Sequence, residues 1–597
     1  MATHTPTRSQ FEPFAPTSAG GKPAARAYVQ QDAAGRRVRI AALLALVVGA
    51  YGLIARDVVI GVGISQPIVA SNNIFFRLYA LHEAPFLWLM VLTGAATWVA
   101  AYRAPLRGSP EWTKAAVARI ARIPAWAAAI AVLTLTAIGT VVVMHGIGLS
   151  MDEHAASFQA RIFASGQIQA TVPTEWRALA PWMTPVFVNY KPIDGVWVAS
   201  YLPVYAAMRA LFSLASAEWL TNSVLAAASV VLLAAVTRRL WLGGRRVRAG
   251  GLALLFLLLS SQFLVTSMSG YSMPAHLCLN LLWLWLYLRD DRPSMALVPW
   301  VGVLALGLHN PVPHALFAAP FLLRVLRDRR YGWMAYCGAV YLAGAIGWYE
   351  WLGFVHTGIG APDAATAADP NVVGGFLTNF SLPGLFSWFV QGMSLALFFT
   401  WQTPVLAIFL PVGLMAWRRL GPVERDLAVG LAAAWCFYAL VSANQGHGWG
   451  YRYLYPVLGN AVLLAARGAD EVWRSGREAL VGRLVLASAV VTILVQWPLR
   501  AMQTESFVRP YAAALAVIAS DPAQVVAVDP ASAWYGRDLV RNDPLFRATP
   551  KVIGLGPVRG RRPDPRLLPA SVQRQVHALT AAELARIGLP IFQQTRR

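Results

Sequence analysis

Two adjacent carboxylates, Asp152 and Glu153, lie just past a long apolar segment, in the stretch GLSMDEHAASFQARIF that spans residues 148–163. Only 28 of the 597 residues are acidic, so acid is scarce in this chain. A carboxylate held at such an edge can act as a general base that removes a proton from a hydroxyl group. The alternative is that both groups are simply solvated at the start of a helix.

Cations that could bind a phosphate occur in two later stretches. Lys191 lies in VNYKPIDG, where the alternative is a lysine whose ammonium group extends to the membrane interface. Arg452 lies in GHGWGYRYLYP, and its planar guanidinium suits a phosphate group. Gly446, Gly448 and Gly450 in the same stretch permit close approach of the backbone to a ligand. The aromatic residues there can stack on sugar rings or form an interfacial aromatic belt.

Further polar and aromatic side chains near these motifs are candidates for contacts with a phosphate, a sugar or an acceptor. They are His154, Tyr190, Tyr271, His276, His309, His314, His447, Trp449, Tyr451 and Tyr453. Many of the histidines are separated by span-length segments, and no HxH or HxxxH pattern occurs. A bound metal is therefore disfavoured.

The composition predicts an integral membrane protein. Hydrophobic residues make up 57% of the chain and charged residues 13%, and several uncharged runs approach the ~20 residues that a helix needs to cross a bilayer. The net charge of +22 is explained by Lys and Arg in cytoplasmic loops and by contact with anionic lipid. No basic domain interleaved with aromatic residues points to nucleic acid. Cys278, Cys337 and Cys436 lie inside apolar segments and lack the spacing of a disulfide framework or a metal site.

The distribution of Lys and Arg among the loops predicts about 12–13 spans that start from a cytoplasmic N-terminus. The basic loop 102–122 is placed inside, so the span near 124–147 runs outward and brings Asp152 to the outer face. Residues 197–237 could hold one span or two. A single crossing places the basic stretch 238–248 on the cytoplasmic side, as its arginines require. All histidines except His4 then lie near or beyond the outer face, which is the arrangement of a catalytic surface rather than of a pathway through the bilayer.

These assignments divide the chain into four parts. They are a disordered cytoplasmic tail (1–38), additional transmembrane helices (39–123), a transmembrane catalytic module (124–499) and a small outer C-terminal domain (500–597). The first large outer loop, 148–196, opens with an amphipathic helical pattern. The C-terminal part contains a predicted strand at QVVAVDP, residues 524–530, and is expected to be a small α/β segment.

The order of the motifs resembles that of the GT-C superfamily of integral-membrane glycosyltransferases, in particular the protein O-mannosyltransferases and the lipid A aminoarabinose transferase. Those families carry an acidic pair in the first large outer loop, a Lys-Pro-Pro and a late Arg-Tyr-x-x-Pro. The matching residues are Asp152, Glu153, Lys191, Pro192, Arg452, Tyr453 and Pro456. Ile193 replaces the second proline of the lysine motif. The similarity covers about residues 124–500.

The resemblance implies an all-α polytopic GT-C fold and an enzyme that moves a sugar from a polyprenyl-phosphate donor, such as an undecaprenyl phosphate, to a hydroxyl with inversion. Asp152 would be the base and Glu153 would orient Asp152 or the acceptor, or the two acids would exchange these roles. Lys191, Arg452 and His447 would stabilise the departing phosphate. No cofactor is expected, and the acceptor is a lipid, a glycan or a protein. The site would face the periplasm from a bacterial inner membrane. A transporter or flippase of lipid-linked sugar is the alternative, although neither an internal repeat nor mid-span charges within the proposed module support it.

Overall fold

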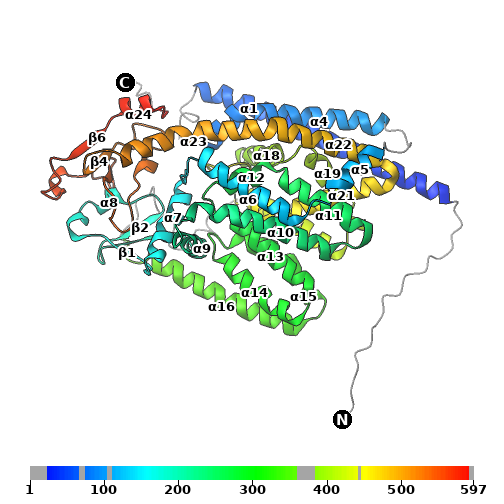
Figure 1. Ribbon diagram of the computed structural model, residues 1–597, viewed down its shortest axis with the longest axis horizontal. Coiled ribbons are helices and arrows are strands. Elements are labelled where there is room, and N and C mark those ends of the chain that lie inside the picture. Colours follow the sequence, from blue (N-terminus) through cyan, green and yellow to red (C-terminus); the bar gives the residue numbers. More distant parts are fainter. Residues whose placement is uncertain are drawn as a thin grey trace, which may run out of the picture.

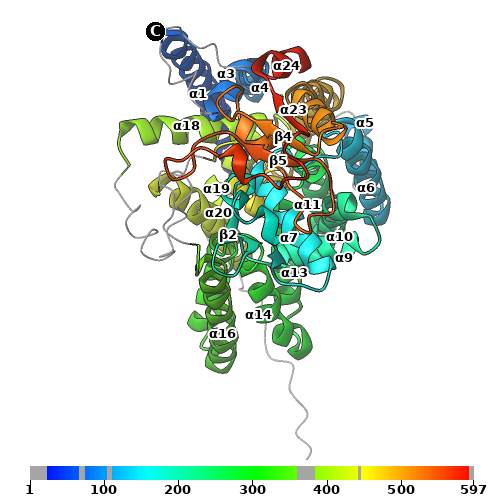
Figure 2. The same cartoon turned by 90° about the vertical axis from the view of Figure 1, so that its left-hand side faces the viewer.

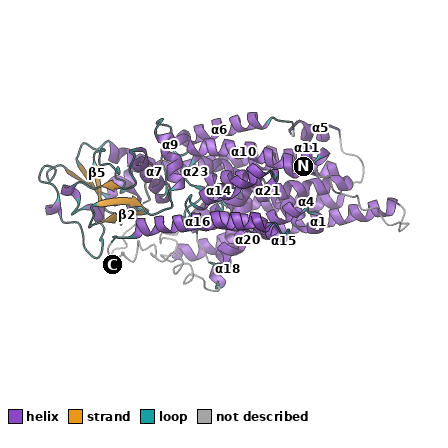
Figure 3. Ribbon diagram, turned by 90° about the horizontal axis from the view of Figure 1, so that it is seen from below, coloured by secondary structure: helices purple, strands orange, loops and turns teal. Residues whose placement is uncertain are grey.

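A bundle of helices forms most of the molecule, and strands gather at one end of its long axis (Figures 1 and 3). The computed structural model describes residues 23–65, 74–103, 111–120, 122–359, 383–441 and 445–590. Helices suit apolar segments of this kind, because a helix satisfies its backbone hydrogen bonds internally where a bilayer offers none.

The helices of the bundle are α1 (Pro23–Ser65), α3 (Ile74–His82), α4 (Ala84–Arg103), α5 (Glu111–Ile120), α6 (Ala125–Val142), α10 (Thr221–Leu240), α11 (Gly243–Leu258), α12 (Ser261–Met268), α13 (Met273–Arg289), α14 (Arg292–Leu306), α15 (Val312–Arg327), α16 (Tyr331–His356), α18 (Leu385–Thr400), α19 (Leu406–Met415), α20 (Pro422–Leu440), α21 (Leu458–Val472), α22 (Glu478–Val491) and α23 (Trp497–Ala519). Many of them follow one another with short connections, whereas a long segment with strands separates α6 from α10.

Within the described residues, five helical stretches are long and apolar enough to cross a membrane, or six if the bent pair α11–α12 forms one span. The five are Ala33–Gly61, Ala84–Tyr102, Ala125–Val142, Glu218–Leu240 and Arg452–Ala519. The protein is therefore an integral membrane protein, as its composition predicts. The total of 12–13 spans stays a prediction.

Two boundaries differ from those expected from the sequence. Helix α1 already begins at Pro23, so residues 23–38 are helical rather than disordered. The tail residues 1–22 lie outside the described part of the chain. Helix α23 continues through position 500 as far as Ala519, so the C-terminal domain is joined to the bundle by an unbroken helix.

Residues 197–237 contain one long apolar helix, α10, preceded by the strand β3 (Val196–Ala199) and the short helix α9 (Val204–Ser213). Helix α9 has ten residues, about 15 Å, which is too short to cross a bilayer. It buries Tyr205 and Arg209 and exposes Leu211 on its other face. Of the two alternatives for this segment, the structure has the single span.

Two small sheets lie at the end of the molecule away from most of the bundle (Figure 3). The first outer loop contains an antiparallel sheet in the order β1-β3-β2, and the C-terminal part a parallel sheet in the order β5-β4-β6. The strands besides β3 are β1 (Ala170–Thr171), β2 (Val188–Lys191), β4 (Val525–Val528), β5 (Lys551–Gly554) and β6 (Val576–Leu579). The strand predicted at 524–530 is confirmed as β4. The sheet in the first outer loop was not predicted.

Both sheets belong to one domain, because their side chains share a hydrophobic core; it is called the outer domain after the side of the membrane predicted for it. Phe158 and Trp197 of the first outer loop cluster with Val525 and Ile553 of the C-terminal sheet. The indole Nε1 of Trp197, which is fully buried, donates a hydrogen bond to the carbonyl of Pro544 at 2.9 Å. The C-terminal segment therefore packs directly on the loop that carries Asp152.

A buried ion pair joins the N-terminal helices to α23. Arg500 donates to both carboxylate oxygens of Glu83, at 2.6 and 2.7 Å, and its guanidinium lies 3.6 Å from the centre of the Phe86 ring. Thr400 and Trp401 donate further hydrogen bonds to Glu83. Glu83 is 2% exposed and Arg500 0%, so neither charge has an alternative partner in solvent.

Replacement of Glu83 by Ala is expected to destabilise the protein strongly, because Arg500 would be left buried without a counter-charge. Removing one partner of a buried pair typically lowers the unfolding free energy by ~3–5 kcal/mol. The control is Asp290→Asn, which weakens an ion pair with Arg330 whose side chains are 61% and 35% exposed. Thermal unfolding in detergent should show a large fall in Tm for Glu83→Ala and a small one for the control. Equal shifts would contradict this assignment.

Candidate active site

Helix α7 (Met151–Ala164) presents the two carboxylates, and a capping box fixes where it begins. The hydroxyl of Ser150 accepts a hydrogen bond from the backbone N–H of Glu153, and the Glu153 carboxylate accepts one from the backbone N–H of Ser150 at 3.1 Å. This reciprocal arrangement places Asp152 in the first turn, where the helix dipole favours a negative charge. The amphipathic helix predicted for this loop is confirmed.

Glu153 is a buried anchor of this helix. One carboxylate oxygen accepts hydrogen bonds from the backbone and hydroxyl of Ser150, and the other accepts one from the backbone N–H of Gly270 at 2.6 Å. Burial raises the pKa of Glu153, and the backbone donors act against that rise. With 1% exposure and both oxygens occupied, this side chain ties the start of α7 to the connection between α12 and α13.

Asp152 faces the opposite way and pairs with Arg452, which lies 300 residues later in the chain. Arg452 Nη1 donates to Asp152 Oδ2 at 2.7 Å, and the hydroxyl of Tyr201 donates to Oδ1. Burial raises the pKa of Asp152, but the charges of Arg452 and His309 and the two hydrogen bonds outweigh it, so the pKa is lowered overall. Asp152 is therefore held ionised between a cation and a phenol.

The position of Arg452 is set by its own backbone and by two aromatic rings. Its backbone N–H donates to the side-chain carbonyl of Gln445 at 2.9 Å. Its guanidinium lies 5.4 Å from the ring centres of both Tyr271 and Tyr453. The Nε of Arg452 is buried and makes no hydrogen bond within the described residues. The side chain is 15% exposed, so a ligand can reach it while most of it is held in place.

Two histidines lie around this pair. Tyr271 shares a 2.8 Å hydrogen bond with Nδ1 of His447, and the His309 ring packs on Tyr201 with their centres 4.0 Å apart. Burial and the charge of Arg452 lower the pKa of His447 to about 3, and burial also lowers the pKa of His309. The His447 imidazole is therefore neutral at pH 7, so one of its ring nitrogens can donate a hydrogen bond and the other can accept one.

Lys191 and Tyr190 contact other elements. The ammonium of Lys191 donates to the carbonyl of Phe354 near the end of α16 and lies 4.2 Å from the centre of the Phe354 ring. The Tyr190 hydroxyl donates to the carbonyl of Arg177, and its ring belongs to the core of the outer domain. Among the described residues, neither side chain contacts Asp152 or Arg452. The phosphate-binding role of Lys191 stays a prediction.

The remaining candidates line the surroundings of the site or the core of the bundle. His314 is fully buried and shares hydrogen bonds with Asn280 and Tyr341, and His276 is buried in α13. Nδ1 of His276 is buried and makes no hydrogen bond within the described residues. The predicted contacts of both histidines with a sugar or an acceptor stay predictions. Trp449 is buried against His447, and the Tyr451 hydroxyl donates to Gln391.

Two candidates closer to the ion pair have distinct neighbours. The Tyr453 ring stacks on Tyr438 with their centres 4.3 Å apart, next to the Arg452 guanidinium. His154 packs beside Phe158, and its Nε2 is buried without a hydrogen bond in the described part of the chain.

The structure adds residues to this site that sequence reasoning missed. Tyr201 follows β3 directly and carries no chemical motif, so nothing in its local sequence pointed to Asp152. Arg209 pairs with Glu218 at 2.7 Å and donates to Ser157 of α7 and to the carbonyl of Gly270. An arginine within the apolar stretch VYAAMRALFS was the available signal for this contact.

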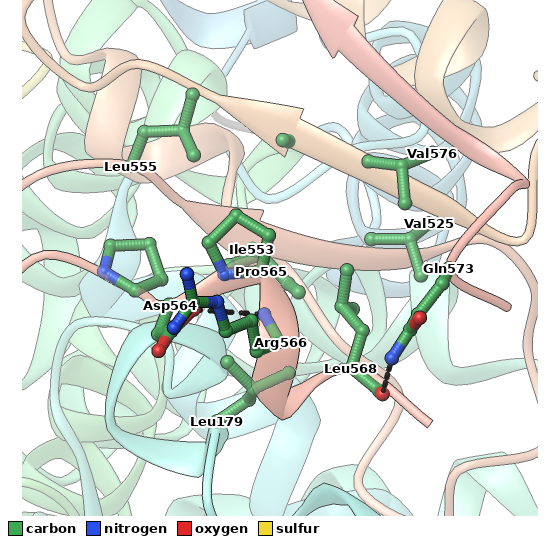
Figure 4. Close-up of a pocket in the computed structure, with 12 residues that line it drawn as sticks. Leu179, Val525, Ile553, Leu555, Asp564, Pro565, Arg566, Leu568, Gln573 and Val576 are labelled. Atoms are coloured by element: carbon green, nitrogen blue, oxygen red, sulfur yellow. Dashed lines mark hydrogen bonds between the residues drawn. The ribbon is translucent and has the colours of Figure 1, made fainter. Parts of the chain in front are cut away.

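No group of three or more His, Cys, Asp or Glu residues in the described ranges is arranged to hold a metal ion. A cavity of about 360 Å³ lies in the outer domain, against the face of the C-terminal sheet (Figure 4). Its walls are mainly aliphatic, with Val525 and Ile553 on the sheet and Leu179 opposite. Asp564 and Arg566 lie at its rim, and Asp564 accepts a hydrogen bond from the backbone N–H of Arg566. The ion pair of α7 is not part of this cavity.

Comparisons with known proteins find similarity in structure. No family model matches the chain, and no curated protein matches its sequence. Its fold is similar to that of ArnT from Cupriavidus metallidurans. The form bound to undecaprenyl phosphate has a TM-score of 0.46 and 14% identity, over 71% of this chain and 86% of that chain. The apo form has the same TM-score and identity, over 72% of this chain and 87% of that chain. At this identity the similarity concerns the fold alone.

The stability of an Arg452→Ala variant is expected to depend on pH in a specific way. In the wild type, ionised Asp152 stabilises the fold above the usual carboxyl pKa, and this contribution is lost as the pH falls through its lowered pKa. In the variant, the carboxylate keeps its burial and loses its counter-charge, so its pKa rises and acid relieves the destabilisation. The Tm difference between the two proteins should therefore be largest near pH 7 and should narrow towards pH 4.

Thermal unfolding in detergent between pH 4 and pH 7.5 measures this effect. The loss at pH 7 should reach at most the ~3–5 kcal/mol of a fully buried pair, because both side chains keep some exposure. The matched control is Arg452→Ala combined with Asp152→Asn, which has no charge left to titrate at this position. A Tm difference that does not change with pH would show that the two groups are not coupled.

Proposed function

We propose that the protein is a glycosyltransferase that moves a sugar from a polyprenyl-phosphate donor to an acceptor hydroxyl at the outer face of the membrane. The observation that carries the proposal is the Asp152–Arg452 pair. It brings Asp152, the candidate base, into contact with Arg452, the residue proposed to bind the phosphate. The two lie at the boundary between the helical bundle and the outer domain. A lipid donor reaches such a site from the bilayer, while the acceptor approaches from the outer domain.

The same pair suggests how the donor prepares the site. Arg452 can offer its guanidinium fork to the donor phosphate, which then competes with Asp152 for the cation. As Arg452 turns to the phosphate, Asp152 loses the charge that contributes most to lowering its pKa and keeps the burial that raises it. Asp152 thereby becomes a stronger base once the donor is bound. Donor binding before acceptor activation follows from this competition.

The chemical step is a single displacement. The proton of the acceptor hydroxyl passes to a carboxylate oxygen of Asp152, and the hydroxyl oxygen bonds to the anomeric carbon. The bond between that carbon and the phosphate oxygen breaks, and its electron pair leaves with the phosphate. Arg452 stabilises the charge that develops on this oxygen, and neutral His447 stands next to it as a hydrogen-bond partner of Tyr271. Attack from the face opposite the phosphate inverts the anomeric centre.

Three neighbouring groups hold this arrangement. Tyr201 fixes the second oxygen of Asp152, and His309 packs on the Tyr201 ring. Glu153, whose oxygens are already occupied, positions α7 and takes no proton from the acceptor in this scheme. For a bacterial inner membrane, the outer face is the periplasmic one.

The proposal is tested by measuring sugar transfer in proteoliposomes. The donors are radiolabelled undecaprenyl-phosphate hexose and undecaprenyl-phosphate aminopentose, and the acceptor is an envelope extract from a strain without the gene. Asp152→Asn and Arg452→Ala should each lower the transfer rate by ~10²–10⁴-fold, the typical loss when a base or a charge-stabilising group is removed. Glu175→Gln, which alters an exposed carboxylate of the same loop, is the control and should retain activity.

Full activity of Asp152→Asn would remove the assignment of the base. Movement of the labelled lipid across the bilayer without transfer to any acceptor would contradict the enzyme and favour a flippase.

A further inference from the structure

The residues just before α7 form an irregular connection whose backbone carbonyls need partners. Helix α6 ends at Val142, and the N-cap of α7 is Ser150. Between them, Gly148 packs so closely on α7 that a Cβ atom on it would lie 3.0 Å from Cβ of Glu153. Leu149 is buried, with 6% exposure. Buried carbonyls in a segment without regular structure must find their hydrogen bonds in another part of the chain.

Arg541 of the C-terminal segment supplies these hydrogen bonds. Its Nη1 donates to the carbonyl of Gly148 at 2.5 Å, and its Nη2 donates to that of Leu149 at 2.7 Å. Its Nε donates to the carbonyl of Asp538 at 2.8 Å, within its own turn. In the described part of the chain, no other group donates to the carbonyls of Gly148 and Leu149. Because the guanidinium is planar, this fork fixes the direction of both contacts as well as their lengths.

The turn that carries Arg541 is held firmly on both sides. Val540 is 3% exposed and belongs to the main hydrophobic core, and Asn542 is 4% exposed. The Asn542 amide donates to the carbonyls of Met183 and Val552 and accepts from the N–H of Val552, at 2.7 to 2.9 Å. The strands β4 and β5 lie at the same end of the molecule as α7 (Figures 1 and 2). The C-terminal sheet can therefore set the position of the connection before α7.

We infer that Arg541 is a positioning residue for sugar transfer, which holds the start of α7 so that Asp152 meets Arg452. The inference deepens the proposed function and rests on it. Asp152 is the second residue after the N-cap, so a shift of the connection moves its carboxylate. The contact between Asp152 Oδ2 and Arg452 Nη1, at 2.7 Å, tolerates little displacement, because hydrogen bonds weaken steeply with poor geometry. Within the described residues, Arg541 makes no hydrogen bond or ion pair with either group, so it acts through the backbone.

The first measurement is the apparent kcat for sugar transfer in proteoliposomes. Arg541→Met keeps an apolar stem and removes the donors, and a displacement of about 1 Å at a reacting group can cost ~10²-fold in rate, so kcat should fall by ~10–10²-fold. The donor KM should change by about three-fold at most, because Arg452 keeps its own support from Gln445. Arg541→Lys, which keeps the charge without the fork, should lie between this variant and the wild type.

The matched control is Arg537→Met in the same turn. In the described part of the chain, the Arg537 guanidinium makes no hydrogen bond or ion pair, so this variant removes a neighbouring positive charge without touching the connection before α7. Its kcat should equal that of the wild type.

A second measurement separates positioning from a general loss of stability. The coupling between Asp152 and Arg452 is obtained from thermal unfolding in detergent at pH 7, as the non-additivity of Asp152→Asn and Arg452→Ala. In an Arg541→Met background this coupling, measured as a Tm difference, should fall to about half or less of its value in the wild-type background, because the two side chains no longer meet in good geometry. A residue that only stabilises the fold would lower all Tm values alike and leave the coupling unchanged.

Two outcomes overturn the inference. One is an unchanged coupling between Asp152 and Arg452 in the Arg541→Met background, and the other is a kcat of Arg541→Met equal to that of the wild type. If Arg541→Met does not fold, Arg541→Lys is used for both measurements. A normal kcat in Arg541→Met beside an inactive Asp152→Asn refutes this inference and leaves the proposed function standing. Full activity of Asp152→Asn refutes the proposed base, and the role of Arg541 in the reaction fails with it.

Discussion

The ion pair between Asp152 and Arg452 is the interaction on which the rest of the site depends. Withdrawing a carboxylate and a guanidinium from water is unfavourable unless their geometry is good and their remaining polar atoms find partners. Tyr201 donates a hydrogen bond to the carboxylate of Asp152, and the rings of Tyr271 and Tyr453 pack against the Arg452 guanidinium. The Nε of Arg452 is buried without a hydrogen bond in the described part of the chain, and both side chains keep limited exposure, at 15% and 17%.

A pair of this kind also needs rigid elements on both sides, because the two residues are 300 positions apart in the chain. On one side, the capping box and the link from Glu153 to Gly270 hold the start of α7. On the other, Gln445 holds the backbone of Arg452. Each support is a partly buried hydrogen bond that involves a backbone N–H, which fixes direction as well as distance. The site is thus built from the first turn of α7, which carries Asp152, and the turn before α21, which carries Arg452.

The sequence predicts the local elements of the site but few of the long-range contacts between them. Ser150 and Glu153 have the spacing of a capping box, and the run around Val525 has the pattern of a buried strand, so α7 and β4 could be predicted. Lys191 was harder to place, because its partner is a carbonyl of α16 that no motif marks. Tyr201 was not found for the same reason. The sheet of the first outer loop depends on pairing between short strands that only the fold brings together.

The two adjacent carboxylates show that neighbouring residues of similar type can have different surroundings. Neighbouring residues on a helix point about 100° apart, so Asp152 and Glu153 cannot both face one ligand. The helix directs Asp152 to Arg452 and Glu153 to Gly270, and the side chain of Asp152 is 17% exposed whereas Glu153 is 1% exposed. Arg541 of the C-terminal segment donates to the carbonyls of Gly148 and Leu149, just before α7, so that segment packs directly on the element that carries both acids.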